Sequence, residues 1–272
     1  MKAKIYSLIL LMSTLFFTSN AQNYFHPVQV INDNANHRFL IPNYGENKGD
    51  SLDYILQRDY NGKVSVFINK LTNPVGIAIL DSVVYFANDS TYILGYGLKS
   101  GKEIFKLKIE GVGQLCGVAT DNKKSLYITD FWGTNLYKVD VSNKSYRVFC
   151  ALGFKKSSGI AYDRKSKRLV FITQTPSSKI YEISLADPEV KLLYDTGIGY
   201  CDGMVIDKHG SLYSGSWKTG NLYRFDVRKE KYCSTPIVSN LGTPVYPYID
   251  SENNSVAIPC WKENTVIFTT LP

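Results

Sequence analysis

The stretch Cys201-Asp202-Gly203-Met204-Val205 is one copy of a phrase that recurs along the chain and decides the fold. Three further copies centre on Gly as well: Pro74-Val75-Gly76-Ile77-Ala78, Leu115-Cys116-Gly117-Val118-Ala119 and Ser157-Ser158-Gly159-Ile160-Ala161. Successive glycines lie 41 to 44 residues apart, and a weaker copy, Val245 to Ile249, follows at the same interval. A repeat of about 40–45 residues is typical of the blades of a β-propeller.

The residues between these phrases form four short segments of alternating apolar and polar residues, separated by turn residues, which indicates strands. Six such units account for residues 22–272. We therefore predict one all-β domain over 22–272, a six-bladed β-propeller of four-stranded antiparallel blades. The recurring Gly fits an inner strand whose backbone closely approaches its neighbour.

The first and last units do not decide which strand closes the ring. The last unit shows only three strands, so Val28 to Ile31 is either the inner strand of blade one, which we favour, or the outer strand of blade six. A closed ring removes the exposed sheet edges that invite aggregation. Blade one also carries an insertion, Gly45 to Asp50, that offers a docking loop.

Residues 1–21 have the pattern of a secretory signal peptide. Lys2 and Lys4 precede the apolar segment Ile5 to Phe17, and Ser19-Asn20-Ala21 suits cleavage after Ala21. We expect the mature chain to be secreted or periplasmic, without a membrane span. The formal charge of +7 falls to +5 without the two lysines, and the remaining positive charges are dispersed, so we expect no nucleic-acid partner.

Five cysteines lie in the predicted mature part of the chain. Cys116 and Cys201 occupy the inner-strand phrase, where we expect buried thiols. The odd number of cysteines does not decide their pairing, and one disulfide that involves Cys150 or Cys233 stays an alternative.

Aligning the six units places polar or small residues at the ends of the second strands and aromatic or polar residues directly after them. In a propeller these positions surround one mouth of the channel. We predict a ligand-binding site there, because carboxylates orient a small polar ligand and aromatic rings stack on it. The predicted residues are Asn88, Asp89, Asp130, Phe131, Asp202, Trp217 and Trp261.

Each predicted site residue also has a structural alternative. Asp89 and Asp130 suit turns that are capped by side-chain hydrogen bonds, and Asp202 suits the loop that enters its inner strand. Trp217 and Trp261 suit packing between blades.

The segment from Cys201 to Tyr213, continued by Gly220 to Asp226, resembles a blade of the gluconolactonase/senescence-marker-protein family and, equally, an NHL repeat. The resemblance implies one divalent cation, calcium, held on the channel axis by a Glu, an Asn and an Asp. Asp202 matches the Asp and is the implied metal ligand, whereas Ser158 and Val28 stand at the Asn and Glu positions.

Two functional hypotheses lead. The first is an exported propeller, expected to be a monomer, that binds a small polar molecule, a glycan or a protein partner at the channel mouth. The second is a metal-dependent hydrolase of the gluconolactonase type, acting on a lactone or ester, in which the metal polarises the carbonyl and activates water. A third reading is an interaction module that docks through blade edges or the insertion.

Overall fold

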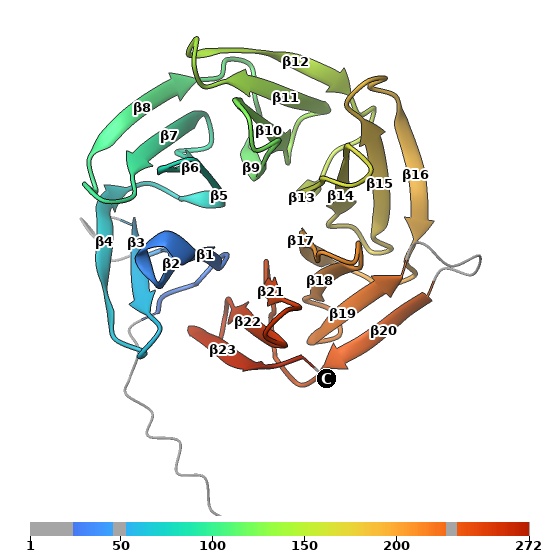
Figure 1. The fold of residues 1–272 in the computed structure, drawn as a ribbon. Helices are drawn as coiled ribbons and strands as arrows, with labels where there is room; N and C mark the ends of the chain where they lie inside the picture. The colour runs from blue at the N-terminus through green and yellow to red at the C-terminus, as the bar shows by residue number, and fades with distance from the viewer. Residues whose placement is uncertain (1–23, 46–52, 227–232, 272) are drawn as a thin grey trace, which may run out of the picture.

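The chain folds into a ring of six antiparallel sheets around a central channel, as the view along the ring axis in Figure 1 shows. The computed structural model describes residues 24–45, 53–226 and 233–271. Residues 1–21 and most of the insertion lie outside these ranges. The all-β, six-bladed prediction is confirmed, and within the described ranges the one helix is a single 3-10 turn, η1 (Asn34–Asn36). No helix in these ranges is long and apolar enough to cross a bilayer.

The strands of each blade run outwards from the channel in chain order. The inner strands are β1 (Ile31–Asp33), β5 (Val75–Leu80), β9 (Leu115–Thr120), β13 (Ser157–Asp163), β17 (Cys201–Ile206) and β21 (Tyr248–Asp250). The second strands are β2 (Arg38–Asn43), β6 (Val83–Asn88), β10 (Ser125–Asp130), β14 (Arg168–Thr173), β18 (Leu212–Ser216) and β22 (Ser255–Cys260). The third strands are β3 (Asp53–Asp59), β7 (Tyr92–Gly97), β11 (Asn135–Asp140), β15 (Lys179–Ser184), β19 (Asn221–Asp226) and β23 (Thr265–Thr270). The outer strands are β4 (Val64–Leu71), β8 (Glu103–Lys108), β12 (Ser145–Ala151), β16 (Val190–Asp195) and β20 (Cys233–Val238).

The recurring Gly lies where neighbouring inner strands nearly touch. A Cβ added at Gly76 would lie 1.8 Å from the carbonyl oxygen of Cys116 in the next blade, and Gly76 has φ of +53°. A Cβ at Gly203 would lie 2.5 Å from the Tyr246 Cα atom. No side chain fits at either position, which confirms the close backbone approach expected from the sequence.

Blades one and six lack this Gly, and their side chains bridge to other blades instead. Gln29 is buried in blade one, where its amide accepts from Ile77 N at 2.8 Å and donates to Ile77 O at 3.2 Å in blade two. Tyr246 reaches from blade six past Gly203 to blade four, where its hydroxyl accepts from Ile160 N at 2.8 Å and donates to Ile160 O at 2.6 Å. These two side chains satisfy backbone groups of other blades.

The segment before β1 is the inner strand of blade one. Pro27 forms a bridge with Asn43, Val28 N donates to Pro42 O at 3.0 Å, and Gln29 pairs in parallel with Tyr246. The alternative assignment of Val28 to Ile31 to the outer edge of blade six is therefore wrong. Within the described residues blade six has three strands, and its red strands lie next to blade one in the ring of Figure 1.

The apolar core is divided among the blade interfaces. Six buried clusters each combine residues of two neighbouring blades, so every blade contributes to two clusters. Packing of this kind stabilises the ring without a continuous sheet.

The cysteines divide between the core and the channel. Cys201 is fully buried as predicted, and burial raises the pKa of its thiol to about 12. Cys116 is only half-buried and lines the channel, so its assignment to the core was wrong. Cys150 is a free thiol, which excludes it from a disulfide, and the side chain of Cys233 lies outside the described part of the chain.

Candidate functional site at the channel mouth

A cavity of about 180 Å³ lies at the end of the channel where the inner strands begin. All six blades contribute to its lining, so the complete ring is needed to build it. The lining residues are Val28, Tyr44, Val75, Gly76, Gln114, Cys116, Phe131, Gln174, Asp202, Trp217, Val245, Tyr246 and Trp261. Four of the seven predicted site residues are among them: Phe131, Asp202, Trp217 and Trp261.

Asp202 supplies the carboxylate of the cavity. It lies in β17, directly before Gly203, whose φ of +76° lets the inner strand bend at the mouth. Removal from water raises the pKa of Asp202 to about 6, and the Gly203 backbone N–H, the Ser158 side chain and the Trp217 indole partly offset this rise. The carboxyl group therefore titrates close to neutral pH.

The charge of Asp202 has no partner of opposite sign in the cavity. The lining residues that the structure describes include no Lys, Arg or His, and none appears among the groups that shift the pKa of this carboxyl. Burial likewise raises the pKa values of Tyr44, Cys116 and Tyr246, and the charge of Asp202 adds to each rise. At neutral pH these three groups are neutral, so the ionised cavity carries one negative charge.

Stacked aromatic rings form one wall of the cavity. The rings of Trp217 and Trp261 lie 5.5 Å apart at 20°, and His26 stacks on Trp261 at 4.2 Å and 22°. His26 is held by its backbone N–H, which donates to Asn264 Oδ1 at 2.8 Å, and its Nδ1 lies 3.0 Å from Trp261 O. The Trp217 Nε1 atom is shielded from solvent, and although it lies near enough to the Asp202 carboxylate to lower its pKa, it makes no hydrogen bond of normal geometry in the described structure. A ligand acceptor would satisfy this donor.

Asp130 does not face the cavity, which corrects its predicted role. Its buried carboxylate accepts hydrogen bonds from the backbone N–H groups of Gly113, Gln114 and Gly133 at 2.9 to 3.1 Å. These bonds tie the loop that enters β9 to the end of β10. The capping alternative therefore describes Asp130, and its lone pairs are occupied by the fold.

Asn88 and Asp89 also lie outside the cavity lining. Asn88 Oδ1 accepts from Thr72 N at 3.0 Å, which ties the loop before β5 to the end of β6 in the manner of Asp130. Asp89 is exposed in a turn with φ of +48°, and its backbone N–H donates to Thr72 O at 2.7 Å. We leave all three residues out of the candidate site.

Five polar or reactive lining residues were not in the predicted site: Tyr44, Gln114, Cys116, Gln174 and Tyr246. Tyr44 and Gln174 belong to the two aligned sets after the second strands, so the repeat itself pointed to them. Tyr246 stands where blades two to five have Gly, and that departure from the repeat was the available signal. Nothing in the sequence distinguished Cys116 from a core thiol.

The cavity does not fit the calcium set implied by the resemblance. Calcium takes six to eight oxygen ligands, most of its neutralising charge coming from carboxylates. Asp202 is the single carboxylate in the lining, Val28 offers no side-chain oxygen, and Asp130 is occupied. No cluster of three or more His, Cys, Asp or Glu suited to a metal ion occurs in the described ranges.

The ring and its mouth define a six-bladed β-propeller with an aromatic, singly acidic cavity on the axis. Residues 112–240 match the family model described as the SMP-30/Gluconolactonase/LRE-like region. The resemblance read from the blade motifs is thus confirmed over blades three to five. No curated protein matches the chain by sequence.

Solved structures match the fold across the ring. A chain of a nidogen/laminin complex is 18% identical, with a TM-score of 0.71 over 80% of this chain and 86% of the other. A structural genomics protein of unknown function from Bacteroides thetaiotaomicron is 16% identical, with a TM-score of 0.76 over 93% of this chain and 71% of the other. At these identities the likeness concerns the fold alone.

Proposed function

We propose that the protein is an exported β-propeller that binds a small polar ligand in the channel-mouth cavity. Asp202 faces a hydrogen-bond donor or positive charge of the ligand, and Trp217 and Trp261 stack on its flat or apolar face. The observation that carries the proposal is a solvent-poor carboxylate without a counter-charge beside a stacked aromatic pair. A partly buried charge of this kind is stabilised by a complementary ligand.

Two features of the cavity restrict the ligand. A volume of about 180 Å³ admits a molecule of small-metabolite size but no folded partner. The charge of the ionised lining disfavours anions, so small amines and neutral polyols are the ligand chemistries that fit.

The test is a titration followed by tryptophan fluorescence, with choline as the cationic probe and glucose as the neutral one. We expect at least one probe to change the emission, because ligand contact alters the surroundings of Trp217 and Trp261. Asp202→Asn should weaken choline binding at least tenfold, since it removes a charge-assisted contact worth about 1.5–3 kcal/mol. Trp217→Ala should weaken the binding of both probes.

Asp187→Asn is the matched control, because it removes one carboxylate from an exposed turn of blade four. It should leave both titrations unchanged. Absence of binding by both probes, or equal binding to wild type and Asp202→Asn, would contradict the proposal.

A metal-dependent hydrolase is the second candidate, favoured by the family match over 112–240 and by the position of Asp202. A carboxyl group with a pKa of about 6 also suits general acid–base chemistry near neutral pH. The donor set argues against this candidate, since it offers one carboxylate for the metal.

Calcium titration of the full chain separates the two candidates. Tight one-to-one binding in calorimetry, with a thermal shift that Asp202→Ala abolishes, would favour the hydrolase and justify a panel of lactones. No heat of binding at millimolar calcium would leave ligand recognition as the function.

Export is part of the proposal and rests on residues 1–21. Fractionation of cells that express the full chain, with N-terminal sequencing of the product, tests it. A mature chain that starts at Gln22 outside the cytoplasm supports export, and an intact Met1 in the cytoplasm contradicts it.

A further inference from the structure

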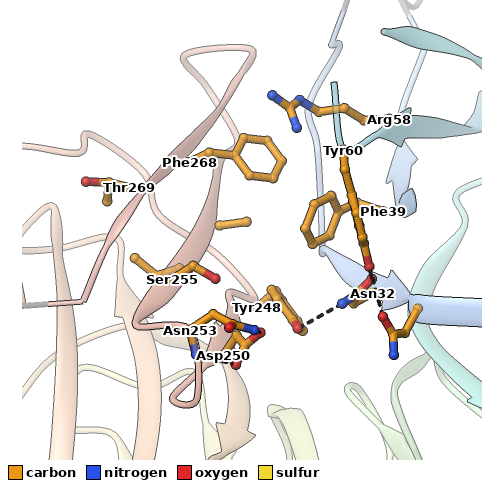
Figure 2. A pocket seen from close by; sticks show the side chains of 13 residues that line it. Asn32, Phe39, Arg58, Tyr60, Tyr248, Asp250, Asn253, Ser255, Phe268 and Thr269 are labelled. Carbon is orange, nitrogen blue, oxygen red and sulfur yellow. Dashed lines mark hydrogen bonds between the residues drawn. The ribbon is translucent and has the colours of Figure 1, made fainter. Parts of the chain in front are cut away.

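A second cavity, of about 370 Å³, lies between blades six and one, where the ring closes. We call it the seam groove. It is at the opposite end of the inner strands from the channel mouth, because its lining includes the β1–β2 and β21–β22 turns. Its principal residues are Phe39, Arg58, Tyr60, Tyr248, Asp250 and Phe268, shown in Figure 2.

Arg58 brings an unpaired positive charge to the seam groove. Its guanidinium carbon lies 4.0 Å from the centroid of the Phe268 ring, so one face of the group is covered. Its Nε atom is shielded from solvent and lacks a hydrogen-bond partner in the described structure. With the residues that the structure describes, Arg58 makes one side-chain hydrogen bond, and it is long: 3.4 Å from Nη1 to Asp59 O.

Two other arginines near the same end of the ring show how such a group is normally satisfied. Arg38 pairs with Asp33 at 2.8 Å and Arg168 with Asp163 at 3.1 Å. Within the described ranges no ion pair is formed by Arg58. Most of its planar set of N–H donors is thus left for an oxyanion, whose geometry it matches.

Aromatic rings supply the apolar floor of the groove. The Phe39 ring lies 5.2 Å from Phe268, 5.4 Å from Tyr60 and 5.5 Å from Tyr248. The tyrosines are fixed through Asn32, which accepts from Tyr60 Oη at 2.8 Å and donates to Tyr248 Oη at 3.0 Å. A ligand with an apolar ring would meet rigid aromatic faces here.

The far end of the groove repels a second negative charge. In Figure 2 Asp250 lies at the opposite end of the labelled side chains from Arg58. Its carboxylate accepts from the backbone of Glu252 and Asn253 and from Asn253 Nδ2, at 2.8 to 3.1 Å, and these bonds help to hold its pKa below the ordinary value. The groove is therefore polarised, with Arg58 at one end and Asp250, whose charge Lys208 partly compensates, at the other.

We propose that the seam groove binds a small organic acid with an apolar or aromatic ring and one carboxylate. The carboxylate pairs with the guanidinium of Arg58, and the ring lies on Phe39 between Tyr60 and Phe268. Because the two walls belong to the first and last blades, the bound acid also joins the ends of the ring. This site is separate from the mouth cavity and does not depend on the function proposed for it.

The test uses 3-phenylpropionate as the probe, with 3-phenylpropan-1-ol as its uncharged counterpart, in calorimetry on the full chain. We expect the acid to bind wild type and to raise its melting temperature. The alcohol and the Arg58→Gln variant should each show at least tenfold weaker binding, the loss expected for a charge-assisted pair. Arg58→Lys, which keeps the charge without the planar donors, should fall between.

Arg147→Gln is the matched control, since Arg147 also stacks on a phenylalanine, Phe149, at 5.4 Å on another blade. It should bind the acid within twofold of wild type, as should Asp202→Asn at the mouth. Tyr60→Ala, at an exposed position, tests the aromatic wall without removing a charge and should weaken binding severalfold. The proposal is overturned if the acid fails to bind wild type, if the alcohol binds equally well, or if Arg58→Gln binds like wild type.

Discussion

At the scale of the residue, the protonation of Asp202 couples the channel mouth to pH. Its pKa is about 6 in the folded protein, against an ordinary value of 3.8, because burial disfavours the ionised form. A raised carboxyl pKa means that the folded state binds the proton more tightly, so this group's contribution to stability is full below pH 4 and is lost as the pH rises through 6.

Asp202→Asn should therefore raise the free energy of unfolding at pH 7.5, by about 1–3 kcal/mol, and leave it nearly unchanged at pH 4. Melting temperatures of wild type and variant across this pH range measure the effect. Asp187→Asn should show no such pH-dependent difference, and a variant that is destabilised equally at both pH values would contradict the prediction.

Binding of a cation at the mouth should follow the same titration. Choline affinity should increase between pH 5 and pH 7, with a midpoint near 6, because only the ionised carboxylate of Asp202 attracts a positive charge. Fluorescence titrations at a series of pH values test this, and glucose should show a much weaker dependence.

At this scale the sequence predicted which residue types line the mouth more accurately than the directions of their side chains. It identified Trp217 and Trp261 from their aligned positions after the second strands, and Asp202 from the family resemblance of its Asp-Gly pair. It misplaced Asp130 because the repeat gives the position of a residue along a strand but not the direction of its side chain. One residue further along the same strand end, Phe131 does reach the cavity.

At the scale of the element, the inner strands depend on glycines that tolerate no side chain. Gly76→Ala should lower stability by more than about 4 kcal/mol, since a new Cβ would lie 1.8 Å from a carbonyl oxygen. Gly153→Ala is the control: it has a similarly positive φ of +77° but nothing within 4 Å. It should cost about 1 kcal/mol, the strain of the backbone alone.

Chemical unfolding of both variants distinguishes contact from backbone strain. The prediction is contradicted if the Gly76→Ala variant is as stable as the Gly153→Ala variant. In that case the inner strands would move apart to admit the new Cβ without a loss of stability.

The loops that enter the inner strands should depend on the side chains at the ends of the second strands. Asp130→Ala leaves the partly buried amides of Gly113, Gln114 and Gly133 without their acceptor, so we expect a loss of about 1–3 kcal/mol. Asp89→Ala, at an exposed turn, should change stability by less than about 0.5 kcal/mol. Equal effects of the two substitutions on the melting temperature would contradict this assignment.

The strands themselves were predictable because a propeller repeats the same four-stranded unit in every blade. Each blade combines the Gly phrase, an alternating second strand and polar turns, and the structure places strands at these positions throughout its described ranges. Gln29 and Tyr246 escaped the prediction, since both replace the repeat's Gly with a side chain that bonds to the backbone of another blade.

At the scale of the whole molecule, the weakest point of the ring should be the contact between blades six and one. Aromatic packing of Phe39 on Phe268 joins them there. Phe268→Ala should lower stability by about 2 kcal/mol and accelerate hydrogen exchange first in β1–β2 and β21–β23. Ile104→Ala, at an exposed position on the outer strand of blade two, is the control and should do neither.

The closure of the ring could not be predicted from the sequence. The repeat predicted six blades, but both assignments of Val28 to Ile31 gave a closed ring. The distinction depended on the hydrogen bonds of Val28 with Pro42 and the pairing of Gln29 with Tyr246. The seam groove was equally hidden, because its walls come from opposite ends of the chain.

The Tyr246 side chain divides the axial passage. Its hydroxyl, anchored on Ile160, places a phenol ring across the path from blade six to blade four. We therefore expect a solute that enters at the mouth to leave at the same end of the channel. On this expectation the channel is open to ligands at one end, and the mouth cavity and the seam groove bind their ligands independently.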